Sequence, residues 1–88
     1  MIYSLTGEII ATDANGFAIR CGGIAFFCFS TMNTMKKIGA KGTTATVHTY
    51  LNVREDAMEL YGFENQNELD AFRQLITVSG VGPKAALA

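Results

Sequence analysis

Cysteine, histidine and charge are all scarce in this sequence. Its 88 residues include two cysteines, Cys21 and Cys28, and one histidine, His48. The cysteines lack the Cys-x-x-Cys spacing of redox and zinc sites, so we expect reduced thiols, no bound metal and no cofactor in a cytoplasmic protein. Charged residues make up only 17% and the net charge is −1, so any binding to nucleic acid must depend on a local surface.

Sequence signs of catalysis and of membrane insertion are also absent. The sequence contains no Walker A motif, no nucleophile with a partner base and no cluster of metal ligands, so we expect no catalytic residues. His48 lies on the polar side of an alternating segment, which favours a surface or packing role. The N-terminus MIYSLTGEII has neither a basic segment nor a long apolar run, so we expect no signal peptide and no membrane span.

The charges that are present are unevenly distributed. Residues 1–52 contain four basic and two acidic residues, a local net charge of +2. Residues 53–70 contain one basic and six acidic residues, a local net charge of −5. Hydrophobic residues make up 49%, which is enough for a folded chain, and at this length we expect one compact core.

The first two-thirds of the chain has the pattern of strands joined by tight turns. Apolar residues recur at every second position, and Asn15-Gly16 and Gly22-Gly23 have the composition of two-residue hairpin turns. The first pair suits a type I′ turn, in which both central residues have positive φ. The pattern predicts five strands, at residues 2–11, 17–21, 24–29, 44–53 and 58–63.

The expected strands suggest a fold. Residues 24–29 are apolar on both faces, which predicts a central strand, whereas residues 44–53 alternate, which predicts one buried side. Residues 30–42 break the pattern and are expected to form a crossing loop with a short helical turn. Five short strands with one longer excursion before the fourth indicate a mainly β fold, a Greek-key barrel of OB-fold type over residues 1–64.

The pattern becomes helical after the fifth strand. Asn65, followed three residues later by Glu68, resembles a capping box and predicts the start of a helix. This helix is expected to stop near Ser79, because glycines follow, and Pro83 suits the first position of a second helix. Residues 65–88 are therefore expected to form the start of a helical unit. The apolar stripe of the first helix consists of Leu69, Phe72, Leu75 and Ile76.

A Gly-x-Gly turn stands between the two expected helices. The run Ser-Gly-Val-Gly-Pro-Lys at residues 79–84 resembles the helix-hairpin-helix motif of proteins that bind DNA independently of sequence. Glycines let the backbone approach a phosphate, a helix N-terminus directs N–H groups at it, and the lysine adds a cation. The alternative is an ordinary helix C-cap followed by a proline-started helix. The residues expected to bind phosphate are Ser79, Gly80, Val81, Gly82 and Lys84.

An acidic turn separates the last two expected strands. Glu55 and Asp56 lie within the run Asn-Val-Arg-Glu-Asp-Ala-Met-Glu-Leu-Tyr-Gly-Phe at residues 52–63. This run resembles the corresponding hairpin of the RuvA family, and its distance from the Gly-Val-Gly-Pro-Lys turn also fits that family. The resemblance runs over the whole chain but covers less than half of a typical family member, so the sequence is expected to be a fragment.

The resemblance implies a fold, a set of partners and a function. It implies an OB-fold barrel, assembly as a homotetramer on four-way junction DNA, and support of the ATP-driven RuvB motor in branch migration during recombination and repair. The motor would be contacted through a C-terminal domain that this sequence does not contain. Glu55 and Asp56 would form the acidic pin at the junction crossover. Each carboxylate repels a phosphate about 6–7 Å away by roughly 1–2 kcal/mol at an intermediate dielectric constant.

Three other interpretations are open. Glu55 and Asp56 could form an ordinary solvated turn. An OB-fold module could instead bind single strands or a protein partner through its face, where Tyr50, Tyr61, Phe63 and residues 26–29 supply aromatic rings. Such a module should prefer single strands over four-way DNA of equal length, and a junction binder should do the reverse. An accessory domain of a repair nuclease or glycosylase would also use a helix-hairpin-helix motif, but the acidic turn argues against it.

Overall fold

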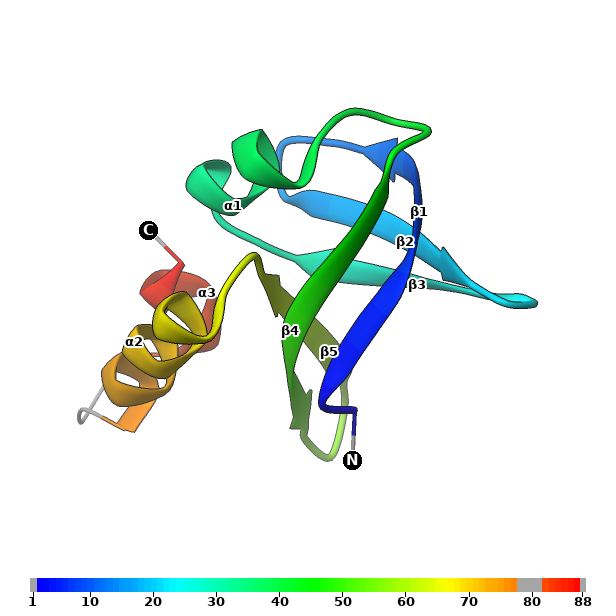
Figure 1. Cartoon of the computed structure of the whole chain (residues 1–88). Coiled ribbons are helices and arrows are strands. Elements are labelled where there is room, and N and C mark those ends of the chain that lie inside the picture. Colours follow the sequence, from blue (N-terminus) through cyan, green and yellow to red (C-terminus); the bar gives the residue numbers. More distant parts are fainter. Residues whose placement is uncertain (1, 78–81, 88) are drawn as a thin grey trace.

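Five strands and three helices make up the described part of the chain (Figure 1). This computed structural model describes residues 2–77 and 82–87. Each of the five strands lies within two residues of its predicted range. The elements in chain order are β1 (Ser4–Thr12), β2 (Gly16–Cys21), β3 (Ile24–Phe29), α1 (Met32–Ile38), β4 (Thr44–Val53), β5 (Met58–Phe63), α2 (Gln66–Thr77) and α3 (Pro83–Ala86).

The strands close into a barrel. Their order around it is β1-β2-β3-β5-β4, and the pairing is antiparallel except between β3 and β5. That parallel seam consists of two residue pairs, Cys28 with Leu60 and Phe29 with Tyr61. The arrangement confirms the predicted five-stranded OB-fold barrel.

The predicted central position of β3 is confirmed by the strand order, although much of the strand is exposed. β3 does lie between β2 and β5, but β5 pairs only with its last two residues. Its first half therefore extends beyond the closed wall, and Ile24 is 60% and Phe27 41% exposed. Figure 1 shows the β2–β3 hairpin projecting from the barrel, with Gly22 (φ +63) in its turn.

The turn between β1 and β2 also differs from the prediction. Neither Asn15 nor Gly16 has a positive φ, so the predicted type I′ turn is wrong. The Asp13 N–H donates to the Gly16 carbonyl (2.9 Å), and the Asp13 carboxylate accepts from the N–H groups of Asn15 (2.7 Å) and Gly16 (3.0 Å). The side chain of Asp13 thus closes an Asx-type turn with Ala14 and Asn15 at its tip.

The segment between β3 and β4 contains a longer helix than the sequence pattern predicts. In α1, Thr31 is the N-cap, and its hydroxyl accepts from the Thr34 N–H (3.0 Å). The helix ends at Gly39, whose φ of +95 is unfavourable for other residues. Ile38 is buried in the barrel core, so α1 closes one end of the barrel.

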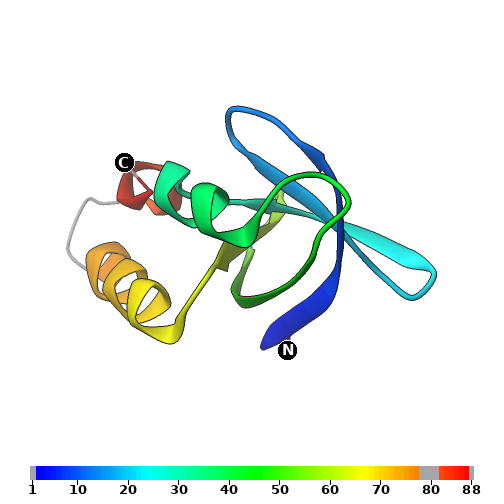
Figure 2. The ribbon, with the colours of Figure 1, turned by 45° about the horizontal axis from the view of Figure 1, so that its top comes forward.

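The buried residues form two clusters rather than the expected single core, because the barrel wall separates its interior from the helices. Figure 2 shows α1, α2 and α3 on the side of the barrel away from the β2–β3 hairpin. The interior cluster contains Leu5, Ile9, Phe17, Ile19, Cys28, Ile38, Val47 and Leu60. The second cluster lies between the wall and the helices and contains Tyr61, Phe63, Leu69, Phe72 and Ala86.

The predicted apolar stripe of α2 is largely confirmed. Leu69 and Phe72 are each 2% exposed, and Ile76 packs against the same cluster, whereas Leu75 is 44% exposed. α2 is described as far as Thr77, and the predicted stop near Ser79 lies outside the described residues. Within residues 2–77 and 82–87, no helix is long and apolar enough to cross a membrane.

Candidate nucleic-acid interface

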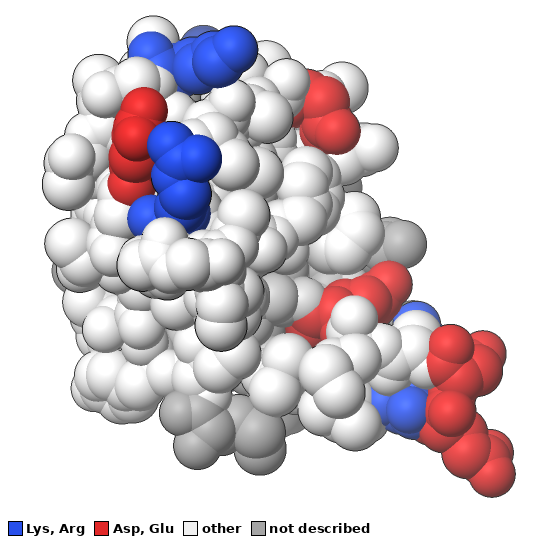
Figure 3. Space-filling view, turned by 90° about the vertical axis from the view of Figure 1, so that its right-hand side faces the viewer, with Lys and Arg blue, Asp and Glu red and all other residues white. Residues whose placement is uncertain are grey.

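The hairpin between β4 and β5 carries two exposed carboxylates at its tip. Val53 pairs with Met58, and the Arg54 N–H donates to the Ala57 carbonyl (2.8 Å), which leaves Glu55 and Asp56 as the two tip residues. Both tip residues are exposed. We call residues 54–57 the acidic hairpin. Figure 3 shows acidic side chains gathered on a protrusion of the surface, with basic atoms at its base.

The strand ends that support the acidic hairpin stand clear of the barrel core. Val53 is 56% exposed and Met58 is 72% exposed, although both are apolar. Neither Glu55 nor Asp56 has a positive φ, so the turn is not the type I′ turn whose twist matches that of the flanking strands.

One carboxylate oxygen ties the base of the acidic hairpin to the barrel. Glu59 Oε1 accepts from Arg54 Nη2 (3.4 Å) and from the Tyr61 hydroxyl (2.8 Å). The Glu59 side chain is 14% exposed, whereas that of Arg54 is 53% exposed. The carboxylate is thus held on the inner side by a phenol and on the outer side by a cation. We call these three residues the hairpin clasp.

Tyr61 connects the hairpin clasp to the aromatic cluster that packs against α2. Its side chain is fully buried, and its ring lies 5.2 Å from that of Phe72 and 5.6 Å from that of Phe29, centroid to centroid. Burial raises the pKa of Tyr61, and the hydrogen bond to Glu59 and the charge of that carboxylate raise it further. The hydroxyl therefore stays protonated and remains a donor across the physiological pH range.

The start of α2 is fixed against α1. The Asn65 side chain accepts from the Glu68 N–H (2.9 Å), which confirms the predicted N-cap. The Glu68 carboxylate does not complete a capping box, because it accepts from the Thr34 hydroxyl (2.9 Å) and the Asn33 amide (2.9 Å) of α1. Thr34 is fully buried, and its hydroxyl oxygen also accepts from the Glu64 N–H (3.3 Å). We call these hydrogen bonds of Thr34 and Asn33 the bracket between α1 and α2, and they fix the start of α2 relative to the barrel.

The predicted phosphate-binding turn is described only at its end. Ser79, Gly80 and Val81 lie outside the described residues. Gly82 is exposed, and its carbonyl accepts from the Ala86 N–H (3.0 Å), so it stands at the start of α3. Pro83 is the first residue of that helix, as predicted, and Lys84 is the second, although its side chain lies outside the description. Phosphate binding by this turn stays a prediction.

Three of the rings named in the single-strand alternative are covered by α2, whereas Phe27 on β3 is 41% exposed. Tyr61 and Phe63 are each at most 1% exposed. The half-buried Tyr50 contacts Phe72 of α2 (5.7 Å between centroids), and the Arg73 guanidinium lies 5.6 Å from the centre of the Tyr50 ring. These rings are engaged by α2, so they are not available to stack on bases.

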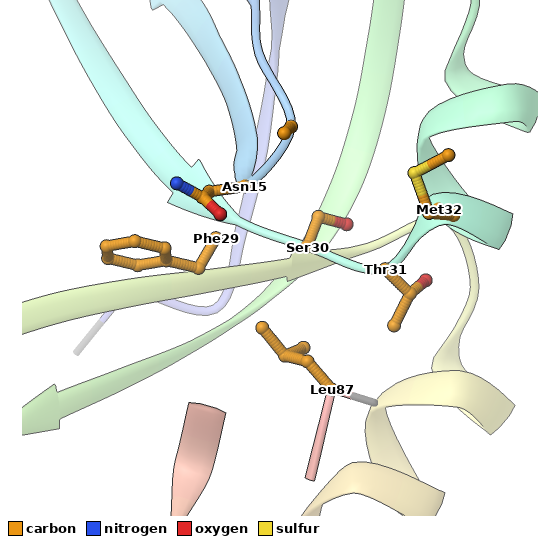
Figure 4. Close-up of a pocket in the computed structure, with 7 residues that line it drawn as sticks. Asn15, Phe29, Ser30, Thr31, Met32 and Leu87 are labelled. Carbon is orange, nitrogen blue, oxygen red and sulfur yellow. The ribbon is translucent and has the colours of Figure 1, made fainter. Parts of the chain in front are cut away.

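A cavity of about 350 Å³ lies between the barrel and the helices. Figure 4 shows that Asn15 and Phe29 reach it from the barrel, Thr31 and Met32 from the start of α1, and Leu87 from the end of α3. Its lining residues carry no ionisable side chain, so they offer no acid, base or metal ligand. Within the described residues, no three His, Cys, Asp or Glu side chains gather where they could hold a metal ion. The lining residues are Ala14, Asn15, Phe29, Ser30, Thr31, Met32 and Leu87.

Sequence reasoning identified the acidic tip but missed the residues that hold it. Glu59 was not assigned a site role, Tyr61 was named only as a stacking ring of the single-strand alternative, and Thr34 was placed in a crossing loop with a short helical turn. A sequence signal did exist for the hairpin clasp. Glu59 and Tyr61 are two residues apart on β5, so their side chains lie on the same face of the strand. No comparable signal exists for the contact of Glu68 with Thr34, which joins residues 34 positions apart.

Comparisons with known proteins match the barrel and the acidic hairpin together. Residues 1–62 match the sequence model of a family described as the RuvA N terminal domain. A protein of Symbiobacterium thermophilum named Holliday junction branch migration complex subunit RuvA is 43% identical over 88 residues, which is 100% of this chain and 43% of that protein. Proteins of the same name from Acetivibrio thermocellus (47% identical, 99% of this chain and 43% of that protein) and Dehalococcoides mccartyi (42%, 100% and 45%) are also similar.

The similarity extends along the whole chain, although the chain spans less than half the length of these relatives. The family match includes the turn that carries Glu55 and Asp56 and the part of β5 that carries Glu59. Two observations lead to one assignment: a closed five-stranded barrel with an acidic tip between its last two strands, and a match along the whole of this chain to proteins of one name. The chain belongs to the RuvA family, whose N-terminal domain it contains.

Proposed function

We propose that this chain supplies the junction-recognising part of a RuvA subunit, which binds Holliday junctions and holds them open for branch migration. The observation that carries the proposal is the exposed pair Glu55 and Asp56 at the tip of a hairpin that stands clear of the barrel. Two carboxylates at this tip repel the phosphates that converge at a four-way crossover, and thereby oppose collapse of the strands onto one another. The relatives' name, a subunit of a branch migration complex, supports the same assignment.

The proposal gives the remaining parts of the molecule separate roles. Residues 1–64 form the barrel unit with the acidic pin, and residues 65–88 begin the first helix-hairpin-helix. In this unit, backbone N–H groups at residues 79–82 and the Lys84 ammonium bind phosphates without reading the base sequence. The chain has no catalytic role, and ATP hydrolysis belongs to a partner motor, RuvB, that the complete subunit contacts elsewhere. A homotetramer is the assembly that matches four arms with one repeated contact.

The acidic pin can be tested by neutralising both tip carboxylates. In the intact protein, Glu55→Gln combined with Asp56→Asn should leave affinity for a four-way junction unchanged or raise it, because two repulsions of roughly 1–2 kcal/mol each are removed. Preference for the junction over duplex of equal length should fall, because duplex has no crossover to receive the charged tip, so the tip repels the duplex phosphates and its neutralisation raises affinity for duplex more than affinity for the junction. Fluorescence anisotropy titrations with both DNAs at one salt concentration give the ratio of dissociation constants. The rate of branch migration driven by the partner motor should change as well.

A matched control separates a local effect from a change in net charge. Glu8→Gln with Asp70→Asn also removes two negative charges, but at exposed sites on β1 and α2. This control should strengthen binding to junction and duplex by similar factors and leave their ratio at the parental value. If the tip variant keeps the parental ratio and migration rate as well, Glu55 and Asp56 are ordinary turn residues and the proposed mechanism is wrong.

The phosphate-binding role of Lys84 makes a different prediction. Lys84→Ala should weaken binding to all DNA sequences by the same factor and lower the slope of log affinity against log salt by about 0.9 per lost contact. Lys41→Ala, in the exposed loop before β4, removes one charge at a distant site and serves as control. A loss that depends on DNA sequence, or a slope equal to that of the control, would count against phosphate binding by Lys84.

A further inference from the structure

The acidic tip is directly preceded by a cation that could cancel its charge. Arg54 is the one basic residue in the segment 53–70, and it adjoins Glu55 in sequence. A guanidinium beside the tip would offset one carboxylate and attract the phosphates that the tip is proposed to repel. The function of the tip thus depends on where the Arg54 side chain is held.

The structure places the Arg54 side chain at the base of the hairpin, away from the tip. Its ion pair within 4 Å, among the described residues, is with Glu59 at the base of the hairpin, and not with Glu55 or Asp56 at the tip. Glu59 is the stronger competitor because its side chain is only 14% exposed, so water and salt screen its charge less than they screen the exposed tip carboxylates. The Tyr61 hydroxyl, at 2.8 Å from the same oxygen, keeps the carboxylate in position.

We infer that Glu59 is a positioning residue that sequesters Arg54, so that Glu55 and Asp56 keep their full negative charge. This inference rests on the proposed function, since it explains how the acidic tip stays uncompensated. Glu59 contributes its own charge to neutralise Arg54 at the base, and the hairpin is left with an electrically neutral stem and an anionic end. The buried ring of Tyr61, packed on Phe72 of α2, holds the Tyr61 hydroxyl and through it the Glu59 carboxylate in place.

The test removes the charge of Glu59 and follows the released arginine. Glu59→Gln keeps an oxygen that can accept from Tyr61 but loses the attraction for Arg54. In the intact protein we expect affinity for duplex to rise by about two- to fivefold, the range of an exposed ion pair, and the preference for junction over duplex to fall. The combined variant Arg54→Ala with Glu59→Gln should return this preference to the parental value, because the freed cation is no longer there.

A second variant and a second readout separate positioning from folding. Tyr61→Phe keeps the buried ring and removes only the hydroxyl, so it should shift the preference in the same direction as Glu59→Gln by a smaller factor. Hydrogen exchange of the Arg54 amide, which donates to Ala57, should accelerate modestly in either variant while the barrel amides keep their protection. An unchanged preference in both variants overturns the inference, and so does a loss of preference in Glu59→Gln that Arg54→Ala fails to reverse.

The tip variant described above distinguishes failure of this inference from failure of the proposed function. If Glu55→Gln with Asp56→Asn lowers the preference for junctions while Glu59→Gln does not, the acidic pin stands and the role of Glu59 is wrong. If the tip variant has no effect, the proposed mechanism itself is wrong, and the inference falls with it.

Discussion

The two cysteines of the barrel differ in burial, and this difference affects the pKa of the Cys28 thiol. Cys28 is fully buried in β3, whereas Cys21 is half-buried at the end of β2, and both thiols are free. Burial raises the pKa of Cys28 from an ordinary value of 9.0 to about 12, and the proximity of Cys21 adds to this effect. The reactive thiolate is therefore suppressed at Cys28.

Alkylation should distinguish the two cysteines. At pH 8, iodoacetamide is expected to modify Cys21 in the folded protein and to leave Cys28 largely unmodified, because burial blocks access and keeps its thiol protonated. Mass spectrometry of peptides after timed labelling measures both rates. In denaturant the two rates should become similar, and equal rates in the folded protein would show that β3 opens readily.

The same thiol makes stability depend on alkaline pH. The unfolded chain loses the Cys28 proton near pH 9 and the folded chain only near pH 12, so the unfolded state is favoured increasingly as pH rises through this window. The free energy of unfolding should fall by up to about 1.4 kcal/mol per pH unit in it. Urea titrations from pH 8 to 10.5 measure the slope. Cys28→Ala should flatten it, and an equally steep curve in that variant would assign the dependence to other groups.

At the scale of elements, close contacts between the backbones of neighbouring strands decide which substitutions the barrel tolerates. Gly16 opens β2, and a Cβ added there would collide with the backbone carbonyl of Cys28 on β3. Gly16→Ala should therefore destabilise the protein by about 3 kcal/mol or more, since a backbone atom cannot move aside cheaply. Gly23→Ala is the matched control, because no atom lies within 4 Å of its added Cβ, and it should change stability by less than about 0.5 kcal/mol. Thermal unfolding of both variants would contradict this account if their losses were alike.

The bracket between α1 and α2 gives a second prediction at this scale. Thr34→Val keeps the shape of a fully buried side chain but removes the hydroxyl that donates to Glu68 and accepts from the Glu64 N–H. We expect a loss of about 1–3 kcal/mol in unfolding free energy, because the Glu64 N–H loses its acceptor and the Glu68 carboxylate loses one of its two donors. Urea denaturation measures the loss. Thr44→Val, at an exposed position of β4, is the control, and an equal effect there would remove the special role of Thr34.

The elements themselves could be predicted because their causes are local. Alternating residues mark β4, and Asn65 at the N-cap marks the start of α2. The turn at Asn15-Gly16 was wrong because the Asp13 carboxylate, which the turn dipeptide does not include, satisfies the backbone instead. The exposure of the first half of β3 could not be predicted, because the number of its residues that pair with β5 depends on tertiary structure and not on the sequence of β3 alone.

The candidate site divides in the same way. The acidic tip follows from its own sequence, whereas the hairpin clasp depends on which face of β5 meets α2. Glu59 and Tyr61 share that face by alternation, but only the packing of Phe72 on Tyr61 shows that α2 covers this outer face of the barrel wall. Contacts of this kind are set by tertiary structure and carry no local pattern.

At the scale of the whole molecule, barrel and helices share one aromatic cluster. Phe72 of α2 packs on Tyr50, Tyr61 and Phe63 of the barrel wall, with ring centroids 4.9 to 5.7 Å apart. The proposed units 1–64 and 65–88 are thus joined by buried contacts rather than by a linker alone, and we expect them to unfold together.

Truncating Phe72 tests this coupling. Phe72→Ala should lower the unfolding free energy by about 3–5 kcal/mol and affect the barrel as much as the helices. Far-ultraviolet circular dichroism and tyrosine fluorescence, the latter from Tyr50 and Tyr61 in the cluster, should report one common urea midpoint. Phe72→Leu should cost less, since it refills much of the space. Two separate midpoints in the parent protein would show that the units are independent.

The distribution of charge along β4 has a consequence for the way the molecule approaches DNA. Lys36, Lys37 and Lys41 precede this strand, the acidic hairpin follows it, and its ten residues span about 33 Å between them (Figure 1). Among the described residues, Lys37 pairs with Glu64 (4.0 Å), which leaves Lys36 and Lys41 as the lysines before β4 that have no ion pair. If the chain binds DNA as proposed, these lysines attract the polyanion while the tip carboxylates repel it, so the charges at the two ends of β4 favour an approach with the acidic hairpin turned away from the DNA backbone. The proposed phosphate contacts of residues 79–84 then have to offset this preference before the tip can enter a crossover.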